Sequence, residues 1–261
     1  IRQIDNSATS GRSVEIMATT FIHRYQSLVS EGVIEPDAAQ EMAAADFAAL
    51  EERVMTHRLA RKSSSLGWLF GRGEKKQPPL KGLYIHGEVG RGKTMLMDLF
   101  FATSLIERKR RAHFHEFMVD VHDRVHGFRQ RIARGELAGA DPIRLTAEAL
   151  FDEAWLLCFD EFHVTDIADA MILGRLLDGL FAKGVILVMT SNYPPERLYP
   201  NGLQRENFLP TIELLKRQLD VLEVEAGVDY RLRALEQVEI YHHPSDAAAE
   251  KKMLDYFRMV A

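Results

Sequence analysis

Short apolar runs alternate with longer segments of helical periodicity through the middle of the chain. The apolar runs predict strands at Leu83–His86, Ala112–Glu116, Trp155–Asp160, Val185–Thr190 and Val221–Glu225. The intervening segments predict helices at Lys93–Ser104, Val119–Arg134, Arg144–Asp152, Ala168–Ala182 and Glu206–Leu219. Strands that alternate with helices in this way form a parallel sheet covered on both faces. The predicted fold class is therefore α/β.

The same pattern predicts how the rest of the chain is organised. Residues 1–60 contain two predicted helices, Val14–Ser30 and Pro36–Leu59, and form a helical N-terminal region. Residues 61–79 are basic and rich in glycine and proline, which is typical of a linker. Residues 80–233 hold the alternating core. Residues 234–261 predict a strand and an amphipathic helix, which we expect to begin a C-terminal lid that continues past residue 261.

An apolar triplet, Trp68-Leu69-Phe70, lies between basic residues within the predicted linker. One interpretation is an exposed linker whose aromatic rings pack on the core. The other is peripheral contact with an anionic membrane surface, or with a protein partner.

A glycine-rich loop follows the first predicted core strand. It reads G-x-x-x-x-G-K-T and consists of Gly87, Glu88, Val89, Gly90, Arg91, Gly92, Lys93 and Thr94. A strand, such a loop and a helix, in this order, form a phosphate-binding loop. Its backbone N–H groups and the helix N-terminus would hold the β-phosphate of ATP. Lys93 would reach the β- and γ-phosphates, and the Thr94 hydroxyl would hold Mg²⁺.

Two acidic residues end the third predicted strand. The apolar run from Ala154 to Phe159 is typical of a buried parallel strand, and it leads into Asp160 and Glu161. Ligands of open α/β sheets bind at the carboxyl ends of the strands. Asp160 therefore fits a Mg²⁺-holding carboxylate, and Glu161 fits the base that polarises an attacking water.

Further candidates follow the later strands. Asn192 ends the fourth strand, where its amide could orient the attacking water and contact the γ-phosphate. Arg205 precedes a predicted helix and is a candidate arginine finger, and Arg217 competes with it for that role. His113 and His115 end the second predicted strand and could reach a central pore or the nucleotide pocket.

Composition narrows the class of protein. The chain has 261 residues, of which 46% are hydrophobic and 27% charged, as in ordinary globular proteins. The net charge of −5 argues against a nucleic-acid-binding field. No segment approaches the roughly 20 apolar residues of a membrane-spanning helix. Cys158 is the only cysteine and lies in an apolar run, so we expect a buried, unreactive thiol.

Several segments together resemble the ZapE/AFG1-like ATPase family. The matching residues are Gly82–Gly87, Met95–Asp98, His113–Met118, Leu157–Met171, Thr190–Asn192, Gly202–Arg205 and Phe208–Pro210. The resemblance covers most of residues 80–245 and implies an AAA+-type P-loop ATPase. It implies that Gly87 to Thr94 are Walker A, Asp160 and Glu161 are Walker B, Asn192 is sensor 1 and Arg205 is the finger. Glu88 departs from the proline or small residue that the family often has there.

The resemblance also implies a biological setting. Bacterial members of the family are linked to cell division through the tubulin-like protein FtsZ, and mitochondrial members to protein quality control at the inner membrane. We therefore expect a Mg²⁺-dependent ATPase that remodels a protein partner, possibly as a homo-oligomer. A bacterial protein would be cytoplasmic or peripheral at the inner membrane, and a eukaryotic one mitochondrial. The alternatives are a nucleic-acid-associated ATPase, such as a helicase loader, and a nucleotide-dependent binding scaffold.

Overall fold

The computed structural model describes residues 20–67 and 80–224 of the chain. Its centre is one sheet of five parallel strands in the order β2-β3-β4-β1-β5. The strands are β1 (Gly82–His86), β2 (Lys109–His113), β3 (Leu156–Asp160), β4 (Ile186–Ser191) and β5 (Leu219–Glu223). Strand β4 lies between β1, which leads into the glycine-rich loop, and β3, which ends in the acidic pair. The predicted parallel α/β sheet is confirmed, with the arrangement of an AAA+-type P-loop protein.

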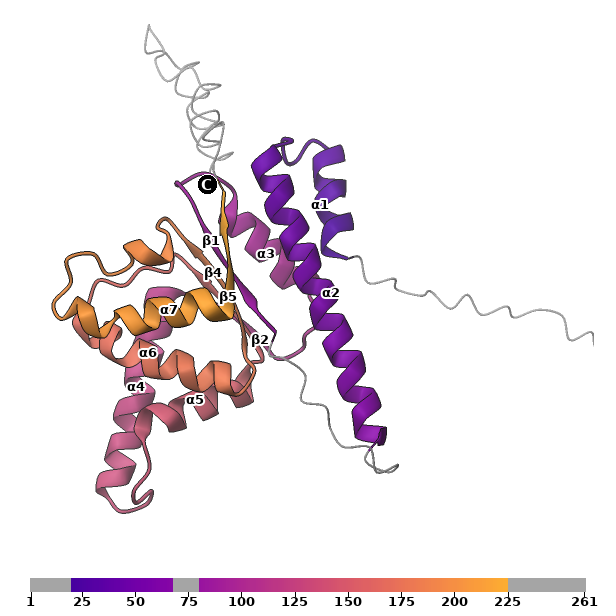
Figure 1. The fold of residues 1–261 in the computed structure, drawn as a ribbon. Coiled ribbons are helices and arrows are strands. Elements are labelled where there is room, and N and C mark those ends of the chain that lie inside the picture. Colours follow the sequence, from indigo (N-terminus) through magenta and orange to yellow (C-terminus); the bar gives the residue numbers. More distant parts are fainter. Residues whose placement is uncertain (1–19, 68–79, 225–261) are drawn as a thin grey trace, which may run out of the picture.

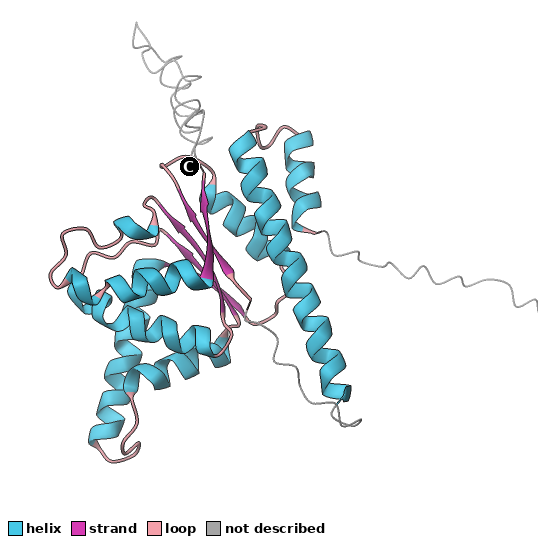
Figure 2. Cartoon of the chain, viewed as in Figure 1, coloured by secondary structure: helices cyan, strands magenta, loops and turns pink. Residues whose placement is uncertain are grey.

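Helices cover both faces of this sheet (Figure 1). The longer helices are α1 (Phe21–Ser30), α2 (Ala38–Gly67), α3 (Lys93–Thr103), α4 (Phe114–Ala133), α5 (Pro142–Glu153), α6 (Ile167–Ala182) and α7 (Leu209–Gln218). Two short 3₁₀ turns, η2 (Pro195–Arg197) and η3 (Arg205–Asn207), precede α7. Helices α1, α2 and α3 lie on one side of the sheet and α4 to α7 on the other (Figure 2).

The alternation of side chains along each strand divides the core between these two layers. In β4, Val188 faces the layer of α1 to α3, and its neighbour Met189 faces the layer of α4 to α7. Cys158 and Phe159 of β3 divide in the same way. Cys158 is fully buried, as expected, and burial raises the pKa of its thiol. The central strands are thus apolar on both faces, which accounts for their uninterrupted apolar runs.

The N-terminal helices share the core of the sheet. Phe21 of α1 and Phe47 of α2 are fully buried, and the Phe47 ring packs at a tilt against Phe21 and Phe100 of α3, with 5.3 Å between ring centroids in each pair. Aromatic contacts of this kind stabilise a layer beyond the burial of area alone. Helices α1 and α2 are therefore fixed against α3, the helix that begins at the glycine-rich loop.

The second strand differs from its prediction. It runs over Lys109–His113 rather than Ala112–Glu116, and α4 begins at Phe114, so His115 is helical. Phe114, Phe117, Met118 and Val121 are all buried at helical spacing, and this packing decides the boundary. The strand itself is a half-exposed edge strand of cationic residues, so it lacks an apolar signature.

The second helix also differs from its prediction. Helix α2 continues to Gly67, past the expected end at Leu59 and into the segment assigned to a linker. No proline or glycine interrupts residues 60–66, and Gly67 supplies a stop signal. Asp37 caps the start of the helix, because its carboxylate accepts bonds from the N–H groups of Ala39 and Gln40.

Some expectations fall outside the described residues. These are the beginning of the first helix before residue 20, the apolar triplet at 68–70 and the proposed lid at 234–261. Within the described ranges, no helix has the length and apolar character needed to cross a membrane.

Candidate functional site

A cavity lies at the carboxyl ends of the strands, where open α/β sheets bind ligands. Its volume is about 710 Å³. The lining residues come from the glycine-rich loop, the ends of β3 and β4, and the turn between α1 and α2: Gly32–Glu35, Gln40, Val89–Met95, Asp160, Glu161 and Thr190–Asn192. The structure thus brings together Lys93, Thr94, Asp160, Glu161 and Asn192, all of which the sequence singled out.

The glycine-rich loop has the backbone geometry of an anion cradle. Gly87, Gly90 and Gly92 have backbone φ angles of 149°, 83° and 78°. Residues other than glycine rarely adopt positive φ angles of this kind. Helix α3 begins at Lys93 directly after Gly92, so its first unpaired N–H groups face the loop. This arrangement favours a phosphate group at the loop.

Lys93 is 7% exposed and bridges the loop to β4. Its Nζ donates to the carbonyl oxygens of Gly87, at 2.8 Å, and Glu88, at 2.6 Å. It also donates to Oδ1 of Asn192 at 3.3 Å. The ammonium group is therefore held inside the cavity beside Asn192, where it can exchange carbonyl partners for phosphate oxygens.

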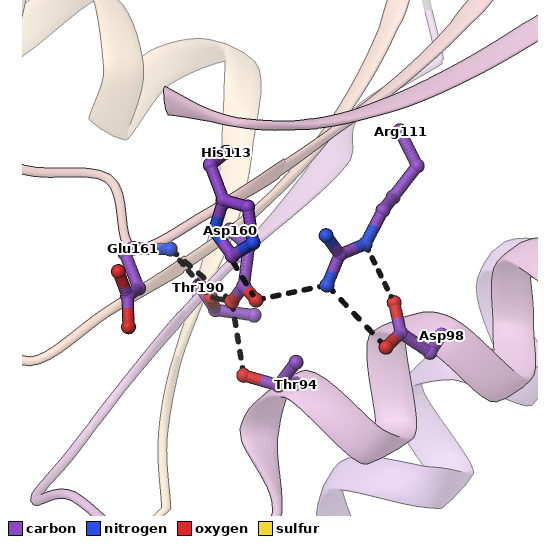
Figure 3. Close-up of polar contacts among 7 residues, drawn as sticks. All are labelled: Thr94, Asp98, Arg111, His113, Asp160, Glu161 and Thr190. Atoms are coloured by element: carbon purple, nitrogen blue, oxygen red, sulfur yellow. Dashed lines mark hydrogen bonds and ion pairs between the residues drawn. The ribbon is translucent and has the colours of Figure 1, made fainter. Parts of the chain in front are cut away.

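Asp160 is the most heavily bonded side chain of the site (Figure 3). Its Oδ1 accepts hydrogen bonds from the hydroxyls of Thr94, at 2.9 Å, and Thr190, at 2.5 Å, and from the Glu161 N–H at 3.2 Å. Its Oδ2 accepts one from Arg111 at 2.9 Å. The carboxylate is only 3% exposed, so these partners replace the water that burial removes.

Arg111 joins this carboxylate to helix α3. Its guanidinium donates to both oxygens of Asp98, at 2.9 Å from Nε and 3.4 Å from Nη2, while Nη2 also bonds Asp160. The Asp98 hydrogen bond, the largest cause, raises the pKa of Arg111 above its usual value. The sequence analysis assigned no role to Arg111, Asp98 or Thr190, because their pairing depends on contacts between distant segments.

Glu161 lines the cavity. Glu161 is exposed and has a φ of 55°, a strained value for a residue with a side chain. Its side chain turns away from the Arg111 bridge in Figure 3 and is free to meet a cavity ligand.

His86 ends β1 directly before the glycine-rich loop. Burial lowers the pKa of His86, and the nearby Lys93 charge acts in the same direction, although Glu223 opposes both.

The turn after α1 contributes a wall of the cavity that the sequence did not indicate. Gly32, Val33, Ile34 and Glu35 line the cavity, together with Gln40 from the first turn of α2. Gln40 is 2% exposed and lies close to Gly92, where an added Cβ would be 2.8 Å from its Nε2. The N-terminal helices are therefore part of this site.

Two sequence candidates lie elsewhere on the molecule. Arg205 is half-buried, donates from Nη2 to the carbonyl of Glu196 at 2.7 Å, and does not line the main cavity. Arg217 is exposed and lines a second cavity of about 420 Å³ between α6 and α7. Glu88, which departs from the family pattern, forms an ion pair with Arg91 at 2.8 Å, and this pairing offsets its charge near the loop.

The oxygen atoms at the base of the cavity suit a magnesium ion. Thr94 Oγ1 and Asp160 Oδ1 lie 2.9 Å apart, and a hydroxyl and a carboxylate are among the ligands that Mg²⁺ takes beside substrate phosphates. Among the described residues, no group of three or more His, Cys, Asp or Glu side chains forms a protein-only metal cage. This sparse ligand set fits an ion shared with a nucleotide.

A parallel sheet with a P-loop after β1 and an acidic pair after β3 defines an AAA+-type P-loop protein. The family model of the AFG1-like ATPases matches residues 19–261. The chain therefore belongs to the AFG1-like ATPase family, and membership implies nucleotide binding.

Two relatives show how much of the family's length is present. "Cell division protein ZapE" of Escherichia coli (strain K12) is 43% identical over 235 residues, which cover 88% of this chain and 60% of that protein. "Lactation elevated protein 1 homolog B" of Danio rerio is 46% identical over 191 residues, which cover 72% of this chain and 38% of that protein. The chain thus spans well under two thirds of either relative.

Solved structures are more distant. The crystal structure of DnaI is 17% identical, with a TM-score of 0.41 over 68% of this chain and 83% of that one. The AMPPCP-bound DnaA of Aquifex aeolicus is 14% identical, with a TM-score of 0.37 over 69% of this chain and 50% of that one.

The backbone geometry at Gly87 predicts that a side chain at this position would destabilise the protein. A Cβ on Gly87 would lie 2.4 Å from the carbonyl oxygen of Val224, a backbone atom, and would require a φ of 149°. We expect Gly87→Ala to lower the free energy of unfolding by about 1–3 kcal/mol, as measured by urea denaturation.

Gly127→Ala is the matched control. Gly127 lies in α4, and a Cβ there would meet no atom within 4 Å. This variant should gain about 0.5–1 kcal/mol, because alanine favours a helix. Equal effects of the two substitutions would contradict the close approach of Val224 to the loop.

Proposed function

We propose that the protein is a Mg²⁺-dependent ATPase that uses hydrolysis to remodel a protein partner. The observation that carries this proposal is the cluster around Asp160. The Thr94 hydroxyl lies against its Oδ1, and Lys93, Glu161 and Asn192 line the same cavity. A nucleotide phosphate, a metal and an attacking water each have a group of suitable chemistry here.

Each side chain has a distinct part in this proposal. The loop N–H groups and Lys93 bind the β- and γ-phosphates, and Lys93 neutralises charge that develops in the transition state. Mg²⁺, when bound, neutralises further phosphate charge, and Thr94 would hold it directly while Asp160 would hold it through water. Glu161 accepts a proton from the attacking water, and Asn192 orients that water against the γ-phosphate.

Arg205 is the proposed finger for a neighbouring subunit. It lies outside its own chain's cavity, beside Leu203, whose side chain is 70% exposed. An arginine outside its own cavity is suited to reach the nucleotide of a neighbouring copy across an interface. This placement favours a homo-oligomer with composite sites. Arg217, also outside the cavity, is the alternative.

The partner is proposed from the family. The similar Escherichia coli protein is called a cell division protein, which makes division proteins, with FtsZ as the first candidate, the class to test. The location would then be the bacterial cytoplasm or its inner-membrane surface. ATP-dependent change in the sedimentation of FtsZ polymers would support this choice. A protein that hydrolyses ATP without affecting FtsZ would require another partner.

The first test separates binding from hydrolysis. Glu161→Gln keeps the shape of the side chain but removes the carboxylate that accepts the proton. We expect unchanged affinity for Mg²⁺ and ATP in a calorimetric titration, and turnover lowered by about 10² or more, measured as phosphate release.

Lys93→Ala provides the contrast, because it removes the loop ammonium group that lies beside Asn192 in the cavity. This variant should lose nucleotide affinity itself. Normal turnover in Glu161→Gln would move the base elsewhere, and turnover absent from the unaltered protein would favour a binding scaffold.

The second test concerns the finger. In the full-length protein, Arg205→Ala should bind ATP normally but hydrolyse it roughly 10³–10⁵ times more slowly. Mixing it with Lys93→Ala subunits should restore part of the activity, because one composite site in a mixed pair is intact.

Arg217→Ala, mixed in the same way, is the control for the competing arginine. An unaffected Arg205→Ala enzyme would identify Arg205 as a surface residue. A slow enzyme that shows no recovery in mixed oligomers, verified by tagged pull-down, would rule out action on the neighbour.

A further inference from the structure

Both oxygens of Asp160 are engaged, but by different kinds of partner. Oδ1 accepts the Thr94 and Thr190 hydroxyls and the Glu161 N–H, which are neutral donors. Oδ2 accepts a hydrogen bond from the cationic guanidinium of Arg111 at 2.9 Å, and His113 Nδ1 lies 4.0 Å from the same oxygen. The carboxylate therefore has a fixed orientation, with Oδ1 toward Thr94 and Thr190 and Oδ2 toward Arg111 (Figure 3).

Arg111 is itself held from the other side. Its Nε and Nη2 donate to the two oxygens of Asp98 in a forked arrangement, at 2.9 and 3.4 Å. A guanidinium gripped in this way is preorganised, because its planar fork matches a carboxylate. Asp98 lies on α3, the helix that also carries Thr94, so the Asp98–Arg111–Asp160 bridge connects the loop helix to the acidic strand.

We propose that Arg111 is a positioning residue that sets the magnesium affinity of the nucleotide site. It holds Oδ2 of Asp160 so that Oδ1 stays beside the Thr94 hydroxyl, where the ion would sit. The proposal rests on the proposed function, since it assigns Arg111 a role in holding Mg²⁺ with ATP. Groups that orient a metal ligand in this way commonly change metal affinity 10- to 100-fold when removed.

The geometry distinguishes this role from competition with the metal. Arg111 contacts Oδ2, whereas Thr94, the direct metal ligand of the proposal, contacts Oδ1. The anchoring by Asp98 keeps the guanidinium on the far side of the carboxylate. A competing cation would instead lie between Thr94 and Asp160, and its removal would tighten magnesium binding.

The experiment measures the linkage between magnesium and nucleotide. The dissociation constant of a fluorescent, non-hydrolysable ATP analogue is measured in EDTA and at a series of free Mg²⁺ concentrations. For Arg111→Met, we expect an unchanged constant in EDTA. The ratio of the constants without and with Mg²⁺ should fall about 10- to 100-fold relative to the unaltered protein. Arg111→Lys should recover part of the ratio, because a lysine keeps the charge but loses the fork.

Arg110→Met is the matched control. Arg110 precedes Arg111 on the same strand, forms ion pairs with Asp120 and Glu153, and has a side chain of similar exposure, 30% against 25%. Both variants should lower the melting temperature, since both lose ion pairs. Only Arg111→Met should lower the ratio of the dissociation constants without and with Mg²⁺. If Arg111 had a purely structural role, this ratio would stay unchanged.

Asp98→Asn serves as a second variant if Arg111→Met does not fold, because the Asp98 side chain is 48% exposed and tolerates change. It should lower the ratio in the same direction by a smaller factor. A ratio equal to that of the unaltered protein in a folded Arg111→Met, or failing that in Asp98→Asn, would overturn the role of Arg111. So would a tighter magnesium response. An unaltered protein that binds the analogue without any magnesium effect would contradict the proposed function as well.

Discussion

The carboxylate of Asp160 is almost completely buried at the end of β3. Burial of a charge is costly unless a counter-charge and hydrogen bonds replace the lost water. Here the compensation comes from three other elements: Arg111 on β2, Thr94 on α3 and Thr190 on β4. One side chain therefore fixes how the edge strand, the loop helix and the neighbouring strand lie relative to one another. The candidate site is built from these same contacts.

The two helical layers support this site in different ways. The layer of α4 to α7 buries one face of β3 and β4 and fixes the strand ends that carry Asp160 and Asn192. The other layer packs α1 and α2 on α3, and it brings Gln40 and the turn at Gly32–Glu35 to the cavity. The N-terminal helices thus take part in the site as well as in the core.

The sequence predicted the local parts of this account and missed the distant ones. The P-loop and the Asp160–Glu161 pair follow apolar strands, so a short window contains both the element and its chemistry. Strand β2 was misplaced because it is a cationic edge strand, and because the burial of Phe114 and Phe117 begins a helix directly after it. Arg111 and Gln40 could not be predicted, since their partners lie far away along the chain. The roles of Lys93, Glu161, Asn192 and Arg205 stay proposals, whereas the contacts of Lys93 with Gly87 and Asn192, and of Thr94 with Asp160, are defined.

A crystal structure of the protein with Mg²⁺ and a non-hydrolysable ATP analogue tests the central claim most directly. The account predicts that Lys93 leaves the carbonyls of Gly87 and Glu88 for the phosphates. It predicts the ion on the Thr94 hydroxyl, with Asp160 Oδ1 toward the ion and Oδ2 still on Arg111. A nucleotide bound away from the loop would contradict the account, as would an ion that displaces Arg111 from Asp160.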